Sequence, residues 1–224
     1  MEKLPAYLGC SYGGCLVKGD NFSIRLLEKE QQDRATQPYE RKSIRSMVIH
    51  YEILNSKNFN THSLNHFVRH QQVKECWRNV DGQWKLVPIE FEENWSIEQC
   101  QKIAADVALH MEKDQTAIGV FDGEEVIGFI TVSHNIFGNT AKYVELVCFQ
   151  VSEPYRGMGI GKALFYHACE EARRLGADKL YISAHSSKES QAAYKALGCV
   201  HAKEINQKLA EEEPCDVQLE YVLD

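Results

Sequence analysis

The spacing of apolar positions changes along the chain, and it predicts a succession of strands and helices. The pair Asp81-Gly82 lies between two runs of β-forming residues, which is a strong hairpin signal, and we expect a hairpin over residues 71–91. Upstream of this hairpin, the pattern predicts a strand from Met47 to Leu54 and a helix over residues 63–70.

After the hairpin, the predicted elements follow one another closely. Ser96 is expected to cap a helix, because the apolar positions that follow it have helical spacing. A capping-box pattern from Ser186 to Glu189 predicts the start of a later helix, which Gly198 ends. The remaining expected elements are strands 117–121, 126–132 and 143–151, helix 160–175, strand 179–183, strands 199–205 and 216–222, and an acidic turn at 211–214. This order predicts an α/β fold (α+β, with a mixed sheet), because hairpins give antiparallel neighbours and a crossover helix gives a parallel pair.

Composition narrows the class of protein. The chain has 224 residues and a formal net charge of −7, which argues against an extended nucleic-acid surface and favours a small cationic substrate. The chain has no apolar run of about 18 residues and its start has no signal-peptide pattern, so we expect a cytoplasmic protein without a membrane partner. The eight cysteines are scattered without a C-x-x-C pair, which favours reduced thiols over disulfides or a metal site.

The first 46 residues differ from the rest, because they combine glycine and cysteine near the start with a charged stretch that offers little core. We expect residues 1–46 to be a peripheral or partly disordered extension. One domain is expected over residues 47–224, with 47–91 as an additional region and 86–222 as its core.

The most informative motif is V-S-E-P-Y-R-G-M-G-I-G-K at residues 151–162, where a strand leads into three alternating glycines that open a helix. Backbone amides at a helix N-terminus have no intrahelical partner and bind phosphate groups. A dinucleotide motif would need glycine where Lys162 stands, and a P-loop would need Ser or Thr where Ala163 stands. The spacing therefore excludes both of these phosphate-binding motifs.

The segment Arg156-Gly-Met-Gly-Ile-Gly161 resembles the Q/R-x-x-G-x-G/A signature of the GNAT superfamily of acyl-CoA N-acyltransferases, and the element order over about residues 86–222 is similar to its splayed, helix-flanked sheet. This resemblance implies that acetyl-CoA is the co-substrate and that no metal is needed. The pyrophosphate would lie on the amides of residues 157–162, and the pantetheine arm would pair with the end of strand 143–151. The residues that the resemblance implies for cofactor binding are Phe149, Gln150, Val151, Arg156, Gly157, Met158, Gly159, Ile160, Gly161 and Lys162.

The resemblance also implies a catalytic tyrosine. The stretch after Ser187 is similar to the family pattern N-x-x-A…Y-x-x-x-G-F, and Tyr194 occupies the tyrosine position. Ser187, Ser190 and Cys199 replace the usual Asn, Ala and aromatic residue. In the functional interpretation, Tyr194 protonates the departing CoA thiolate; in the structural one, its ring packs in the core.

Glu145 interrupts an apolar strand, in alternation with Val147, Phe149 and Val151. Burial of a carboxylate is costly unless it is paired or used, and burial raises its pKa toward the range of a general base. The family resemblance places a catalytic glutamate here in some members, whereas a salt bridge or a solvated edge is the structural alternative. His185, at the end of the next strand, and an ordered water are the competing bases.

Two further groups have mainly structural interpretations. His62, His66 and His70 recur every fourth residue, but no cysteine or carboxylate follows at matching spacing, which favours a solvated helix face over a metal site. Trp77 and Trp84 are expected to pack across the hairpin, with a substrate pocket wall as the alternative.

We therefore expect an N-acetyltransferase that moves an acetyl group from acetyl-CoA to a primary amine of a small molecule, by direct attack in a ternary complex. The alternatives are a non-catalytic acyl-CoA-binding module, a protein or peptide N-acetyltransferase, and a nucleotide-binding protein of another fold. The expected partner is a small amine and not a nucleic acid or a membrane; a homodimer is left open.

Overall fold

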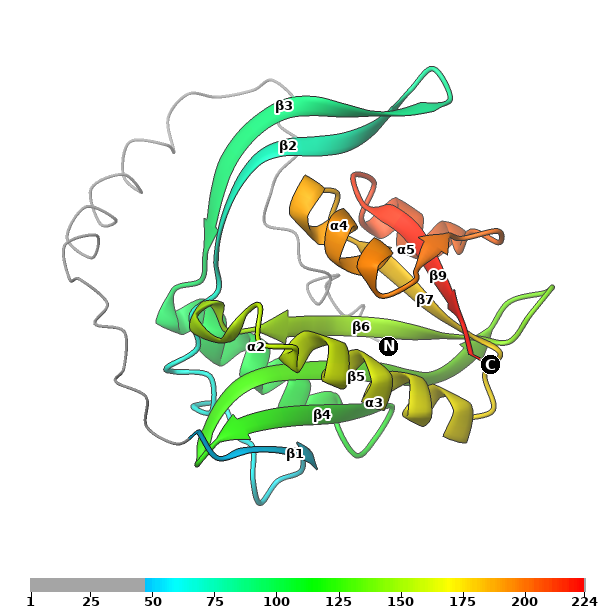
Figure 1. Cartoon of the computed structure of the whole chain (residues 1–224). Helices are drawn as coiled ribbons and strands as arrows, with labels where there is room; N and C mark the ends of the chain where they lie inside the picture. The colour runs from blue at the N-terminus through cyan, green and yellow to red at the C-terminus, as the bar shows by residue number, and fades with distance from the viewer. Residues whose placement is uncertain (1–46, 224) are drawn as a thin grey trace. The chain divides into compact units, whose positions relative to one another are not determined.

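The computed structural model describes residues 47–223, so the expectation for residues 1–46 lies outside the described part of the chain. The described strands form a seven-stranded sheet with the order β1-β4-β5-β6-β7-β9-β8 and a separate two-stranded sheet, β2-β3, whose arrangement can be followed in Figure 1. The strands are β1 Ile49–Ile53, β2 His70–Val80, β3 Gln83–Asn94, β4 Gln115–Asp122, β5 Glu125–Phe137, β6 Tyr143–Val151, β7 Lys179–Ala184, β8 Val200–His201 and β9 Val217–Val222. The described helices are α2 Ile97–His110, α3 Ile160–Arg174, α4 Lys188–Ala196 and α5 Gln207–Glu212, with the 3-10 turn η1 Glu153–Tyr155.

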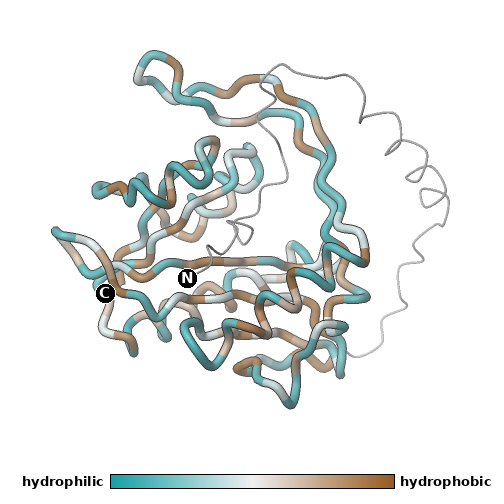
Figure 2. The backbone as a smooth tube through the Cα atoms, turned by 180° about the vertical axis from the view of Figure 1, so that it is seen from behind, coloured by the Kyte–Doolittle hydropathy of each residue, from teal (hydrophilic) through white to brown (hydrophobic). Residues whose placement is uncertain are grey.

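The sheet is mixed, because β6 and β7 are parallel and the other neighbouring strands are antiparallel. Helix α3 packs on one face and α2 on the other, and each face has its own cluster of buried apolar side chains (Figure 1). Figure 2 shows that hydrophobic residues gather along the central strands and on the sides of the helices that face them. The mixed α/β fold predicted from the element order is confirmed.

The hairpin forms where the sequence predicted it. Asp81 and Gly82 both have positive φ, 53° and 78°, as a two-residue type I′ turn requires. The two tryptophans do not face each other, because Trp77 pairs with Leu86 and Trp84 stacks on the His201 ring of β8 at 5.5 Å. Both therefore have packing roles, at the middle and the tip of the hairpin.

The helix expected over residues 63–70 is wrong. Residues 61–66 form turns, and His70 already begins β2. The Asn60 side chain accepts a hydrogen bond from the His62 amide, and Ser63 Oγ accepts one from the Asn60 amide. Such local bonds between side chains and backbone compete with helix formation, so the three histidines do not share a helical face.

Three predictions near the C-terminus also need correction. The N-cap of α4 is Ser187, whose side chain accepts from the Ser190 amide, and not Ser186. The strand expected over residues 199–205 is reduced to the two residues of β8, and the acidic segment that was expected to be a turn contributes to α5. Helix α5 forms because Asn206 caps it by accepting from the Leu209 amide.

The pairing of β6 with β7 is short. Only Tyr143, Val144 and Glu145 of β6 pair with β7, and Glu145 lies opposite Tyr181. Beyond this point no strand pairing joins residues 146–151 of β6 to residues 182–184 of β7. We call this region the β6–β7 splay, and Figure 1 shows the two strands diverging there.

The hairpin connects the two strand ends at the wide end of the splay. At its base, the Glu153 amide after β6 donates to the Val68 carbonyl oxygen at 2.8 Å. Farther along β2, the Trp77 amide donates to the Ser186 carbonyl oxygen after β7, also at 2.8 Å. The hairpin thus holds the two diverging ends in place without filling the missing strand pairing.

The close contact of α3 with the sheet depends on Gly128 of β5. A Cβ at Gly128 would lie 2.8 Å from Val120 Cγ1, 3.1 Å from the Gln150 carbonyl oxygen and 3.2 Å from Leu164 Cδ1. We expect Gly128→Ala to lower the free energy of unfolding by about 1–3 kcal/mol through overpacking, measured by urea denaturation.

Gly161→Ala is the matched control for Gly128→Ala. Its Cβ would lie 3.4 Å from Phe149 Cζ, at an ordinary contact distance, and alanine suits a helix better than glycine. We expect this variant to be as stable as the wild type or more stable. Equal stability of the two alanine variants would contradict the packing argument.

Candidate active site

The N-terminus of α3 differs from those of the other described helices. Ser96, Ser187 and Asn206 cap α2, α4 and α5 with their side chains, whereas the N-cap of α3 is Gly159, which has no side-chain cap. Within the described part of the chain, the amides of residues 157–162 donate no hydrogen bond to a backbone carbonyl, and the first such donor is Ala163. A run of free amides at the positive end of a helix is suited to bind an anion.

The glycines leave space around these amides. Gly157 and Gly159 have φ of 78° and 83°, and a Cβ at either position would meet nothing within 4 Å. The residues present therefore fit a phosphate group that approaches the backbone closely.

The two cations of this loop have different surroundings. Arg156 donates from Nε to the Val151 carbonyl oxygen at 3.0 Å and from Nη1 to the His70 carbonyl oxygen at 2.7 Å. Its hydrogen bonds therefore tie the loop to β6 and to the hairpin. Lys162 is exposed, and its ammonium lies over the Tyr166 ring at 5.7 Å.

Aromatic contacts join this loop to α4. The Phe149 ring of β6 lies 6.4 Å from the Phe165 ring of α3 and 6.2 Å from the Tyr194 ring of α4. A Cβ at Gly161 would lie 3.4 Å from Cζ of the same Phe149 ring. The structure thus brings Tyr194, the end of β6 and the start of α3 together on the α3 side of the splay.

Glu145 lies on a different side of β6 from Phe149, although the sequence pattern placed both on one face. The register on β5 shifts between Leu146 and Cys148, so that Val147 is an extra residue. Leu146 and Phe149 accordingly belong to the core cluster under α3, and Cys148 belongs to the cluster under α2. This β-bulge is a tertiary feature that a strict two-residue alternation misses.

Glu145 occupies the narrow end of the splay, at the last paired position of β6, and is partly buried. Burial raises the pKa of its carboxyl to about 7, with a further contribution from Glu212 that Lys208 opposes. Among residues 47–223, no hydrogen bond or ion pair holds this carboxylate. A carboxyl group of this pKa without a structural partner is suited to exchange a proton at neutral pH.

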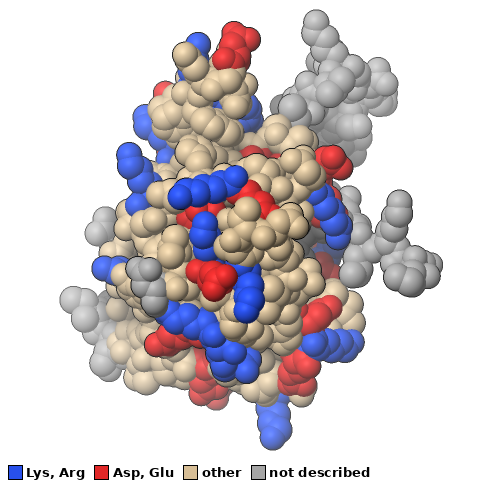
Figure 3. All heavy atoms as spheres, turned by 90° about the vertical axis from the view of Figure 1, so that its right-hand side faces the viewer, with Lys and Arg blue, Asp and Glu red and all other residues tan. Residues whose placement is uncertain are grey.

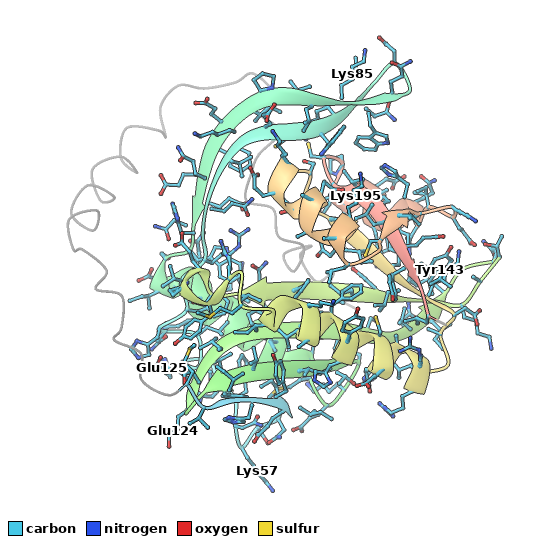
Figure 4. The ribbon with its side chains drawn as sticks, in the orientation of Figure 1. Lys57, Lys85, Glu124, Glu125, Tyr143 and Lys195 are labelled. Carbon is cyan, nitrogen blue, oxygen red and sulfur yellow. The ribbon has the colours of Figure 1, made fainter. Side chains whose placement is uncertain are left out.

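The strand pairing next to Glu145 is held by a buried polar network. Tyr143, labelled in Figure 4, donates its hydroxyl to Glu220 of β9 at 2.7 Å, and Lys179 of β7 donates to the same carboxylate at 2.8 Å. Glu220 is 1% exposed, and its partners satisfy both oxygens. The narrow end of the splay is therefore fixed by three strands.

His185, the competing base, accepts a hydrogen bond at one ring nitrogen and faces Glu93 with the other. Its Nδ1 accepts from the Ser187 amide at 3.2 Å, which requires the proton on Nε2, and Nε2 lies 3.6 Å from Glu93 Oε1. Burial lowers the pKa of His185, against the opposing effect of Glu93. The geometry favours a positioning role for this imidazole.

Sequence reasoning missed Arg69 and Glu93, which form a buried ion pair beside His185 at the base of the hairpin. Counting outward from the Asp81-Gly82 turn would have placed these two residues at neighbouring strand ends. The signal was therefore in the sequence, but charged residues at hairpin ends are usually solvated.

No group of side chains suited to hold a metal ion is found in the described residues. His70 instead contacts Glu92 and Glu153, both at 3.1 Å, and His62 contacts Gln101. Within residues 47–223, Cys76, Cys100, Cys169 and Cys199 are buried and form no disulfide bond. On the face shown in Figure 3, basic and acidic side chains are interspersed. No helix in the described range is long and apolar enough to cross a membrane.

A family model described as "Acetyltransferase (GNAT) family" matches residues 79–199, which is more than half of the 224-residue chain. The chain belongs to the GNAT acetyltransferase family. The expectation drawn from the glycine motif is confirmed, and the alternative of a nucleotide-binding protein with another fold is excluded. No curated protein matches this GNAT sequence.

Solved GNAT structures share the fold at low sequence identity. A protein assigned as a streptothricin acetyltransferase from Bacillus anthracis str. Ames, in complex with acetyl coenzyme A, is 15% identical with a TM-score of 0.58 over 80% of this chain and 100% of that one. Nourseothricin acetyltransferase is 15% identical with a TM-score of 0.55, over 79% and 99% of the two chains. PaiA N-acetyltransferase from Thermoplasma acidophilum, in complex with coenzyme A, is 16% identical with a TM-score of 0.50, also over 79% and 99%.

The raised pKa of Glu145 predicts how the stability of this GNAT protein depends on pH. The folded chain holds the proton up to a pKa of about 7, against an ordinary value of 4.5, so the free energy of unfolding falls as pH rises through this window. Glu145→Gln replaces the carboxyl group with a neutral amide, so the variant does not lose this stability as pH rises. We expect the variant to exceed the wild type at about pH 8 by at most about 3 kcal/mol, and to equal it at about pH 4, in urea titrations.

Glu124→Gln is the control for the loss of one carboxylate, because Glu124 is exposed on the turn between β4 and β5 (Figure 4). We expect this variant to show no such pH-dependent gain. A constant difference between Glu145→Gln and the wild type at all pH values would contradict the assignment.

Proposed function

We propose that the protein transfers an acetyl group from acetyl-CoA to a primary amine of a small molecule, by direct attack in a ternary complex. The observation that carries this proposal is the position of the free amides of residues 157–162 next to the wide end of the splay. An anion site and an unpaired strand end thus adjoin each other in a protein of the GNAT acetyltransferase family.

The residues proposed to hold the co-substrate lie in one continuous region. The amides of residues 157–162 would bind the pyrophosphate, with Lys162 as an exposed cation beside them. The backbone of Phe149, Gln150 and Val151 would pair with the pantetheine arm, because β7 does not pair with this stretch. Fold neighbours bound to acetyl-CoA and to CoA support acetyl-CoA as the co-substrate.

The proposed chemistry divides between the two sides of β6. Acetyl-CoA supplies the acetyl group as an activated thioester. Glu145, on the side of Tyr181 and α5, would take a proton from the substrate ammonium, directly or through a water. Tyr194, next to Phe149, would supply a proton to the departing thiolate, and a backbone N–H near the end of β6 would polarise the thioester carbonyl.

A small amine as acceptor has independent support. Nourseothricin acetyltransferase and the protein assigned as a streptothricin acetyltransferase are named for small antibiotics. The formal net charge of −7 also suits a cationic substrate.

The direct test measures CoA release from acetyl-CoA with a panel of polyamines, amino acids and aminoglycosides. We expect turnover with at least one amine, with kcat/KM rising through about pH 7 as Glu145 loses its proton. Glu145→Gln should lower kcat by about 10²–10⁴-fold and remove this pH dependence. Tyr194→Phe should lower kcat and leave the KM for acetyl-CoA unchanged.

Different failures of this test have different meanings. Binding of CoA without turnover of any amine would favour the non-catalytic acyl-CoA-binding module. Turnover with peptides alone would favour a protein or peptide N-acetyltransferase. Unchanged kinetics in both variants would remove Glu145 and Tyr194 from the mechanism.

The proposed anion site has its own test at Gly157, where a side chain would enter open space at positive φ. Asn and Asp tolerate this backbone conformation best among the non-glycine residues, and they have the same shape. We expect Gly157→Asp to bind CoA at least about tenfold more weakly than Gly157→Asn, because its carboxylate repels the pyrophosphate. Isothermal titration calorimetry measures both affinities; equal values would place the pyrophosphate elsewhere.

A further inference from the structure

The base of the hairpin contains a buried cluster of three titratable side chains. Arg69, Glu93 and His185 are 5%, 8% and 9% exposed. Arg69 Nη2 donates to Glu93 Oε2 at 2.7 Å, and Glu93 Oε1 lies 3.6 Å from His185 Nε2. These residues come from the start of β2, the end of β3 and the end of β7, so the tertiary structure assembles the cluster.

The cluster has more donors than acceptors. Arg69 Nε and Nη1 are buried and have no hydrogen-bond partner in the structure as described. A guanidinium is always charged and only donates, so these groups call for an oxygen acceptor, and a negatively charged one matches the charge. Glu93 accepts from Nη2 only, so the N–H groups of Nε and Nη1 remain as donors for one further carboxylate.

Arg69 lies near the glycine loop, where burial and then the charge of Arg69 lower the pKa of Arg156, but its own guanidinium packs toward the face of the sheet that α2 covers. Its guanidinium lies 5.9 Å from the centre of the Trp95 ring, and Trp95 packs against the core cluster under α2. The amides proposed to bind the pyrophosphate open α3, which packs on the opposite face of the sheet. A doubly charged phosphate beside Glu93 would also be repelled, whereas a single carboxylate is repelled less.

We propose that Arg69 binds the carboxylate of the acceptor, so that the substrate is an amine that also carries a carboxylate, as an amino acid does. This inference rests on the proposed function, because it names the substrate class of the same site. Arg69 and Glu93 form the anion-binding part, and His185 holds Glu93 in place from β7.

The experiment compares each of the twenty L-amino acids with its carboxamide, which keeps the amine and removes the negative charge. We expect kcat/KM for CoA release to be about ten- to a hundredfold higher for the preferred acid than for its amide, mainly through KM. In the presence of CoA, the acid should also raise the melting temperature more than the amide does.

Arg69→Lys tests the residue itself, because lysine keeps the positive charge beside Glu93 but lacks the planar set of donors. We expect this variant to lose most of the preference for acid over amide and to keep its affinity for CoA. Arg78→Lys is the matched control: Arg78 Nη1 donates to the Trp77 carbonyl oxygen and to Ser186 Oγ, so its guanidinium is already engaged by the protein. The control should retain the preference.

The outcomes separate this inference from the proposed function. Equal kinetics and equal melting temperatures with acids and amides overturn the carboxylate site, even if amines are acetylated. A melting-temperature preference for acids that Arg69→Lys abolishes supports the site, even if no turnover occurs and the proposed function fails. A preference that survives in Arg69→Lys also overturns it. If Arg69→Lys does not fold, the wild-type comparison of acid with amide decides alone.

Discussion

The short pairing of β6 with β7 is the constraint on which the rest of this structure depends. The two parallel strands pair through three residues of each strand and then separate. Buried backbone groups need hydrogen-bond partners, so an unpaired strand end inside a protein must be covered by other segments or by a ligand. In this chain the hairpin approaches both strand ends, and the end of β6 is followed at once by the glycine loop that opens α3.

The splay is maintained from both ends. At its narrow end, Tyr143 and Lys179 share the buried Glu220 carboxylate, which holds β6, β7 and β9 together. At its wide end, the hairpin base bonds to the residues after β6, and its middle bonds to the residues after β7. A buried ion pair that loses one partner is costly, so both ends resist rearrangement. These contacts hold the two strands apart in the fold.

Groups of different charge lie on different sides of the splay. The free amides of α3 and Lys162 give one side a positive character that suits a phosphate, whereas Glu145 lies at the narrow end, where burial favours its neutral form. Arg69 adds a buried cation at the hairpin base, where its donors exceed the acceptors around them. The β-bulge at Val147 places Glu145 and Phe149 on different sides of β6, because it changes which side chains of this strand face α3.

Local chemistry determined much of this protein from its sequence alone. The Asp81-Gly82 turn, the Ser96 cap, strand β6 and the glycine-opened helix α3 are set by backbone preferences of adjacent residues, and each was predicted. The glycine spacing predicted the candidate cofactor loop, and a carboxylate within an apolar strand singled out Glu145; the roles of both are proposals. The helix expected over residues 63–70 was wrong, because Asn60 and Ser63 form side-chain bonds that an apolar pattern does not reveal. Only the tertiary structure decided the side of β6 on which Glu145 lies, the position of His185 beside Glu93, and the burial of the Arg69–Glu93 pair. Those features depend on one bulged residue and on contacts between segments up to 116 residues apart, such as Gln71 with Ser187, which no local pattern encodes.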